Sequence, residues 1–130
     1  MAAEKSWAST LGLVWSKEAP GLVSTFTPAP EHRGPPGFLH GGVAAAVLDE
    51  TMAALSITAD GWHSVTAKLE LRYRSPVPLD GRPLRIEAWR DASGGRRAQK
   101  IHGRLLTSSG VAAVEATGLF VRVDAESGDE

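Results

Sequence analysis

The sequence contains no cysteine among its 130 residues. This absence excludes disulfide bonds, thiolate metal sites and a cysteine nucleophile. The four histidines show none of the paired spacings that are typical of metal ligands. We therefore expect neither a bound metal nor another cofactor.

Strong net charge and long apolar runs are also absent. Acidic and basic residues nearly cancel, at a formal net charge of −1, so no overall field would attract nucleic acid or an anionic membrane surface. No stretch has the apolar length that a signal peptide or a membrane span needs. The sequence thus predicts a soluble, cytoplasmic protein that neither binds nucleic acid nor inserts into membranes.

The length and the hydrophobic content of 42% suit one domain with a core, whereas two domains would need a longer chain. We expect a single domain over residues 1–124, with an N-terminal extension at 1–20 and an acidic, flexible tail at 125–130. Apolar residues between positions 7 and 15 fall at helical spacing, which predicts a short amphipathic helix in the extension.

A glycine- and proline-rich turn at residues 34–42 leads into a run of helix formers at 43–57. The first amides of a helix have no intrahelical partner and carry the positive end of its dipole. Gly41 and Gly42 would therefore offer bare N–H groups to an anionic oxygen. His40, immediately before them, is expected to support this turn or to cap the helix, and not to act as a general base.

Two consecutive acids, Asp49 and Glu50, interrupt the apolar helix. Carboxylates are rarely buried unless they are paired or take part in function. The residues at helical spacing from Asp49 are mostly small, so that face of the helix suits close packing. Both acids could simply face solvent, but the pattern favours a functional role for at least one of them.

Alternating apolar and polar residues predict five strands separated by short turns, at 21–27, 65–74, 84–89, 97–107 and 111–123. Short turns imply antiparallel pairing. A sheet with one apolar and one charged face needs cover on its apolar side, and the helix is the element apolar enough to provide it. The sequence therefore predicts an α+β fold in which a curved, five-stranded antiparallel sheet wraps around a central helix.

Three segments carry a resemblance to a known family, namely residues 34–38 ahead of His40-Gly41-Gly42, residues 66–79 and residues 114–121. In this order and spacing, with an acid nine residues after His40, the sequence resembles the hotdog-fold acyl-CoA thioesterases of the phenylacetate-pathway type. Within them it is most similar to the thioesterase-superfamily-member group, which acts on long-chain acyl-CoA. The resemblance implies a hotdog fold and hydrolysis of acyl-CoA or acyl-carrier-protein thioesters.

The resemblance also implies roles for individual residues. Asp49 would attack the thioester or activate water, the Gly41 amide would polarise the carbonyl, and Thr66 would position the water or the carboxylate. Many family members have an asparagine six residues before the histidine that helps to form the oxyanion hole. The long-chain group shares the glycine found here, Gly34, and the source of a second donor stays open.

Further candidates each have a plain structural alternative. Glu50 is the second candidate for the catalytic acid or else makes a structural hydrogen bond. Aromatic side chains near the helix ends either pack or border an acyl channel. Arginines in the hairpin before residue 98 are either solvated or hold the phosphates of coenzyme A. The predicted substrate-binding residues are Gly42, Phe38, Glu50, Trp62, Arg96 and Arg97.

A geometric consideration predicts a homodimer. Gly41 and Asp49 are eight residues apart, which is about 12 Å along one helix at 1.5 Å per residue. One thioester carbonyl cannot contact both groups over that distance. Two antiparallel copies of the helix would bring Gly41 of one chain to Asp49 of the other, so an active site built from both residues requires a dimer, and a tetramer is possible.

Two other functions compete with thioester hydrolysis. One is a hotdog module that binds acyl-CoA without turning it over, but an acyl pocket gains nothing from a buried carboxylate. The other is a hotdog dehydratase, which would need a catalytic histidine facing an acid. His40 lies in a glycine turn and no other histidine is better placed, so hydrolysis is the preferred interpretation.

Overall fold

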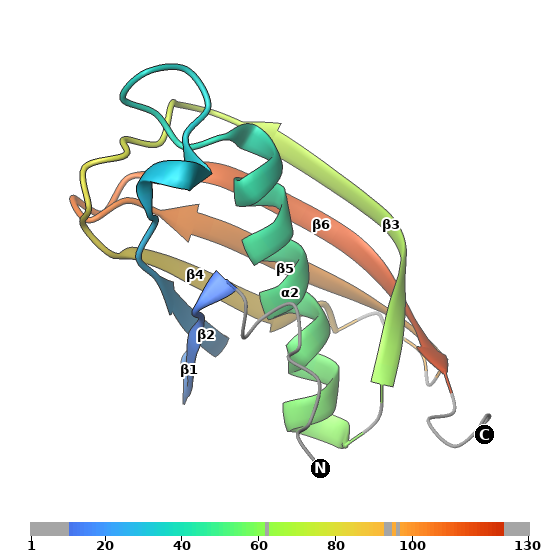
Figure 1. The fold of residues 1–130 in the computed structure, drawn as a ribbon. Coiled ribbons are helices and arrows are strands. Elements are labelled where there is room, and N and C mark those ends of the chain that lie inside the picture. Colours follow the sequence, from blue (N-terminus) through green and yellow to red (C-terminus); the bar gives the residue numbers. More distant parts are fainter. Residues whose placement is uncertain (1–10, 62, 93–94, 96, 124–130) are drawn as a thin grey trace, which may run out of the picture.

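The structure is a computed structural model that describes residues 11–61, 63–92, 95 and 97–123 (Figure 1). Within these ranges the elements are β1 (Val14–Glu18), β2 (Gly21–Phe26), the 3-10 helix η1 (Pro30–His32), α2 (Gly41–Asp60), β3 (His63–Tyr73), β4 (Leu84–Arg90), β5 (Ala98–Leu106) and β6 (Ala112–Val123). The strands form one antiparallel sheet in the order β1-β2-β4-β5-β6-β3. The sheet curves around α2 (Figure 1), which confirms the predicted α+β architecture.

The sheet has six strands, one more than the sequence predicts. The additional strand is β1, which pairs with β2 from Val14 opposite Thr25 to Glu18 opposite Gly21. The predicted helix at 7–15 is therefore wrong where it overlaps β1, and residues 1–10 lie outside the described residues, as does the tail at 125–130. Apolar residues in so short a stretch fit the period of a helix as well as that of a strand. Pairing with β2 is a long-range contact, which local periodicity cannot reveal.

The helix α2 is longer than predicted at both ends because both ends are capped. At its start, His40 has an extended backbone and its Nδ1 accepts a 2.8 Å hydrogen bond from the Gly42 N–H. At its end, Gly61 has a left-handed backbone with φ 76° and its N–H donates to the Ile57 carbonyl. In the part of the chain that the structure describes, no helix is long and apolar enough to cross a membrane.

The core lies between α2 and the concave face of the sheet. Leu48 and Met52 of α2 are fully buried there, together with Phe26 of β2 and Phe120 of β6. Gly103 of β5 permits the close approach, because a Cβ at this position would lie 2.9 Å from the Met52 sulfur. This packing fixes the distance between the helix and the sheet, and thereby the place of every side chain on the two sides of α2.

The outer face of the sheet carries ion pairs, and one of its carboxylates is buried. Glu87 of β4 accepts a 2.6 Å hydrogen bond from Arg104 Nε and a 2.7 Å bond from Arg85 Nε, while its side chain is only 9% exposed. Burial raises the pKa of Glu87, but the bonds from the two arginines outweigh it and hold that pKa below its usual value. The alternation of β4 places Glu87 on the outer face correctly, but it cannot reveal that the arginines cover it.

Candidate active site

The carboxylate of Asp49 is hydrogen-bonded to the edge strand β3. Thr66 Oγ1 donates to Asp49 Oδ1 over 2.7 Å. Asp49 is half-buried on α2, and Thr66 is exposed. The structure thus brings together two of the residues that the sequence predicts for the site, one from the helix and one from the strand that follows it.

A β-bulge in β3 makes this contact possible. The register with β6 shifts between Thr66 and Lys68, so that Ala67 is left without a partner. Thr66 lies opposite Phe120 and Leu69 lies opposite Gly118; both partners are buried on the helix side. Because cross-strand partners share a face, Thr66 also faces α2. The plain alternation of the sequence puts Thr66 on the polar side, and the bulge reverses that assignment.

At the other end of the site, one backbone amide is open. The Gly42 N–H donates to His40 Nδ1 over 2.8 Å, so the expectation of a bare amide is wrong for Gly42. Among the described residues, the Gly41 N–H has no hydrogen-bond partner. His40 acts as the helix cap, and a side chain on Gly42 would disturb it, since a Cβ there would lie 3.0 Å from the imidazole ring. The first turn of α2 therefore presents one free donor, at Gly41.

Tyr73, at the end of β3, contacts the same turn. Its hydroxyl donates a 2.7 Å hydrogen bond to the Gly41 carbonyl, and burial raises the pKa of this tyrosine. The sequence does not single out Tyr73 as a site residue, because it belongs to the regular alternation of its strand. No local pattern links it to a glycine 32 residues earlier in the chain.

An apolar pocket of about 530 Å³ opens beside Gly41. Its lining consists of Pro35, Phe38, Leu39, Gly41, Ala44, Tyr73, Arg74, Ser75, Pro76 and Val77. Phe38, which the sequence predicts at the border of an acyl channel, is 40% exposed at this pocket. A second depression of about 450 Å³ lies between β3 and β6 and is lined mostly by charged residues. The pocket at Gly41 has the size and the apolar lining of a ligand site.

Within one chain, the open amide and the carboxylate are separate. Gly41 begins α2 and Asp49 follows eight residues later on the same helix, which corresponds to about 12 Å along its axis. The chain therefore carries two half-sites: an amide beside an apolar pocket, and a carboxylate held by a threonine.

Glu50 differs from Asp49 in its surroundings. Burial, together with the neighbouring charge of Asp49, raises the pKa of Glu50. No hydrogen bond to a described residue contributes to the pKa of the Glu50 carboxyl group, whereas the Asp49 carboxylate accepts a bond from Thr66. Of the two candidate acids, Asp49 is thus the one whose carboxylate is hydrogen-bonded to β3.

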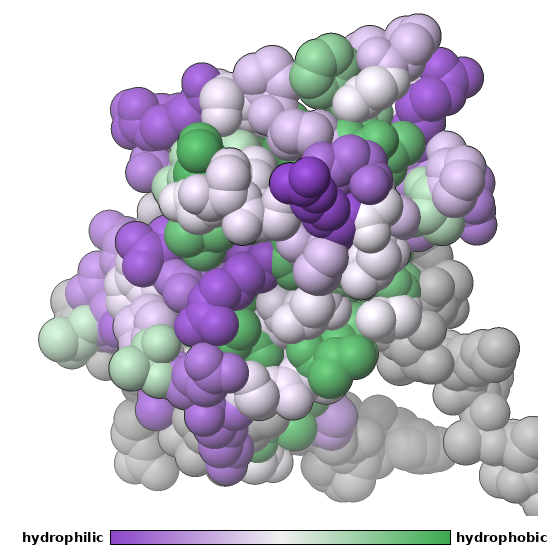
Figure 2. Space-filling view, turned by 90° about the vertical axis from the view of Figure 1, so that its left-hand side faces the viewer, coloured by the Kyte–Doolittle hydropathy of each residue, from purple (hydrophilic) through white to green (hydrophobic). Residues whose placement is uncertain are grey.

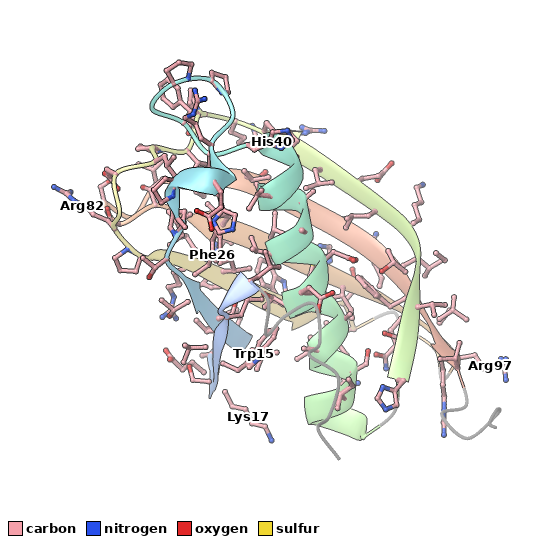
Figure 3. The ribbon with its side chains drawn as sticks, in the orientation of Figure 1. Trp15, Lys17, Phe26, His40, Arg82 and Arg97 are labelled. Carbon is pink, nitrogen blue, oxygen red and sulfur yellow. The ribbon has the colours of Figure 1, made fainter. Side chains whose placement is uncertain are left out.

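Of the two arginines predicted to hold the coenzyme A phosphates, Arg97 lies away from the helix start. Arg97 is exposed, and Figure 3 shows it at the end of the molecule opposite to His40. Its backbone carbonyl accepts a 2.7 Å hydrogen bond from the Arg122 N–H. Trp62 and Arg96 lie outside the described residues. Contacts of Arg96 and Arg97 with coenzyme A stay predictions.

Known proteins share this fold and parts of the sequence. The profile of the thioesterase superfamily matches residues 36–114. The chain is 31% identical to acyl-coenzyme A thioesterase THEM4 of Xenopus laevis over 119 residues, which cover 85% of this chain and 49% of that protein. The chain spans about half the length of the curated relatives it matches.

Solved structures agree with this comparison. The BH2602 protein from Bacillus halodurans, crystallised with CoA, superimposes with a TM-score of 0.78 at 25% identity, covering 91% of this chain and 78% of that one. A phenylacetic acid degradation-related protein from Ralstonia eutropha superimposes with a TM-score of 0.80 at 28% identity, covering 94% of this chain and 92% of that one.

The curved sheet around a central helix defines a hotdog-fold protein. More specifically, the chain belongs to the thioesterase superfamily, whose profile covers more than half of it. The family predicted from the sequence is thereby confirmed.

Proposed function

We propose that this chain hydrolyses acyl-CoA thioesters to a free acid and a thiol, with acyl-carrier-protein thioesters as the alternative substrate. The observation that carries the proposal is the hydrogen bond from Thr66 to Asp49 on a thioesterase-superfamily fold. That bond orients a half-buried carboxylate at the edge of the sheet, which a protein that only binds acyl-CoA would not need. The acyl-coenzyme A thioesterase name of a relative that covers 85% of this chain supports the same activity.

The groups of the two half-sites fit the chemistry of thioester hydrolysis. Thr66 holds Oδ1 of Asp49, so that Oδ2 can take a proton from water while the water oxygen attacks the thioester carbon. Alternatively, the carboxylate attacks that carbon itself and forms an anhydride that water then cleaves. In both cases the carbonyl oxygen gains negative charge, which the open Gly41 N–H would stabilise. The C–S bond then breaks and releases a thiolate, which becomes the thiol by taking a proton from protonated Asp49 in the first route or from water in the second.

The proposal requires two copies of the chain, because one carbonyl cannot reach across about 12 Å of helix. The two edge strands of the sheet differ in a way that indicates which of them a partner copy would contact. Strand β1 is five residues long and ends in Lys17 and Glu18, which protect an edge from pairing. Strand β3 also carries exposed charges, among them Lys68 and Glu70, but it is eleven residues long and exposes Val65 by 50% and Tyr73 by 53%.

Figure 2 views the left-hand side of Figure 1, away from β3, where, apart from the grey atoms, hydrophobic areas are small and lie among hydrophilic ones. We therefore place the partner copy at β3 and at the adjoining outward face of α2, where Ala46 and Ala53 are partly exposed. In this arrangement Gly41 of one protomer faces Asp49 and Thr66 of its partner. Further pairing into a tetramer stays a prediction.

The pocket beside Gly41 suits the apolar part of the substrate. Its wall includes the side chains of Phe38, Leu39 and Val77. An acyl chain in this pocket would leave its thioester carbonyl next to the Gly41 N–H, because Gly41 forms part of the lining.

A thiol-release assay on a series of acyl-CoA substrates tests the proposal. We expect thiol release that is proportional to protein concentration and that is lost in Asp49→Asn. Tight binding of acyl-CoA without release of thiol would instead identify a binding module. Hydration or dehydration of an acyl-CoA without cleavage would identify a dehydratase.

A further inference from the structure

The peptide bond between Gly41 and Gly42 is held at both of its ends. Its carbonyl accepts the 2.7 Å hydrogen bond from the Tyr73 hydroxyl, and its N–H donates the 2.8 Å bond to His40 Nδ1. Two successive glycines have the greatest backbone freedom of any residue pair. The side chains of Tyr73 and His40 remove that freedom at the turn where the Gly41 N–H must keep a fixed direction.

The preceding peptide bond carries the open amide. Its carbonyl, that of His40, accepts bonds from the Val43 N–H at 3.0 Å and from the Ala44 N–H at 3.1 Å. Donors on a carbonyl polarise the whole peptide group and make its N–H a stronger donor. The Gly41 N–H therefore belongs to a peptide that is anchored by the helix, and the next peptide is anchored by Tyr73 and His40.

Tyr73 contributes more than its hydroxyl to this turn. Its ring would lie 3.6 Å from a Cβ built on Gly41, and it forms part of the pocket wall. Its side chain reaches this turn from the far end of β3, at a position that is 53% exposed in a single chain. A tyrosine this exposed contributes little to the core of a single chain, and packing of its ring against a partner copy would not require the hydrogen bond from its hydroxyl to the Gly41 carbonyl.

We propose that Tyr73 is a positioning residue that fixes the Gly41 carbonyl and thereby directs the open Gly41 N–H at the thioester oxygen. This inference rests on the proposed thioesterase function and adds to the site a residue from β3. It assigns to Tyr73 an effect on turnover that is separate from substrate binding, because the tyrosine ring keeps its place in the pocket when only the hydroxyl is removed.

Tyr73→Phe tests the inference, since it deletes the hydroxyl and retains the ring. We expect kcat on acyl-CoA to fall about three- to tenfold, as for the loss of one hydrogen bond, with KM changed less than about twofold. Thr117→Val is the matched control, because it also removes a hydroxyl, one that lies on β6 and contacts His102 Nδ1 at 3.4 Å. It should leave kcat and KM unchanged. Equal kcat in Tyr73→Phe and the unaltered protein would overturn the inference.

Amide hydrogen exchange of glycine-labelled protein provides a readout that does not depend on turnover. In Tyr73→Phe the Gly42 amide should exchange about three- to tenfold faster, while that of Gly103 in β5 should not change. Unchanged exchange at Gly42 would overturn the inference even if kcat fell. If the unaltered protein cleaves no acyl-CoA, the proposed function fails, and the exchange rates alone decide whether Tyr73 orders the turn.

Discussion

Thr66 Oγ1 donates a 2.7 Å hydrogen bond to Asp49 Oδ1, and this bond connects the central helix to the unpaired edge of the sheet. It occupies one carboxylate oxygen and leaves the other available to a water molecule or a thioester. A carboxylate that is held in one orientation needs no reorganisation during the reaction.

Asp49→Asn should keep the fold and lower kcat by about 10²–10⁴-fold, because an amide can neither take a proton from water nor form an anhydride. Glu50→Gln serves as the matched control, since it makes the same change one residue further along α2, and it should have a far smaller effect. Thiol release at equal folded yield measures both. A larger loss in Glu50→Gln would show that the catalytic acid is misassigned.

Thr66→Val should lower kcat about three- to tenfold with little change in stability, because valine keeps the β-branched shape and lacks only the hydroxyl. Thr66→Ser retains the donor and should stay close to the unaltered protein. Thiol release gives kcat, and thermal unfolding at one protein concentration gives the stability. Unaltered kinetics in Thr66→Val would show that the Thr66 hydroxyl has no role in turnover.

Mixing two inactive variants tests the shared site. Gly41→Pro removes the open N–H, and His40 already has the extended backbone, with ψ 132°, that a residue before proline requires. Mixed with Asp49→Asn chains in equal amounts, about half of the dimers should be mixed, and each of these contains one intact site. Thiol release should therefore return to roughly a quarter of the activity of the unaltered protein.

Two controls accompany the mixing experiment. Each variant alone should be nearly inactive, and Gly41→Ala, which keeps the N–H, should retain more activity than Gly41→Pro. Alanine fits here because its Cβ would lie 3.6 Å from the Tyr73 ring, an ordinary contact. If mass spectrometry shows mixed dimers but no activity returns, Gly41 and Asp49 do not combine across protomers and the paired-helix arrangement is wrong.

Glu87→Gln should lower the free energy of unfolding at pH 7 by about 1–2 kcal/mol, since glutamine keeps the shape and loses the charge that Arg85 and Arg104 bond. The folded-state pKa of Glu87 is lowered, so its contribution is present above the ordinary carboxyl pKa and is lost as the pH falls through the folded-state value. The difference in the free energy of unfolding between Glu87→Gln and the unaltered protein should therefore become smaller as the pH falls.

Denaturant unfolding between neutral and acidic pH, at one protein concentration, measures this effect. Glu70→Gln is the control, because Glu70 is 67% exposed and its pair with Lys68 spans 3.5 Å. It should change stability very little at any pH. A constant difference between Glu87→Gln and the unaltered protein down to the acid limit would contradict the prediction.

The sequence by itself determined the central helix, five of the six strands and the family, and it singled out Asp49 and the helix start as candidate site residues. Alternation in the strands and the capped, apolar helix depend on neighbours within a few residues, so β4, β5 and the sheet-facing side of α2 follow from periodicity. Asp49 and the turn at His40 were also predicted, because a carboxylate in an apolar helix and a glycine pair before it are local features.

Tertiary structure alone decided the remaining features. The bulge at Ala67 turned Thr66 toward Asp49, long-range pairing made residues 14–18 a strand, and Arg104 covered Glu87 from a neighbouring strand. The contact of Tyr73 with Gly41 joins residues 32 positions apart. Each of these depends on register and on packing between distant segments, which the order of residues along a single element does not encode.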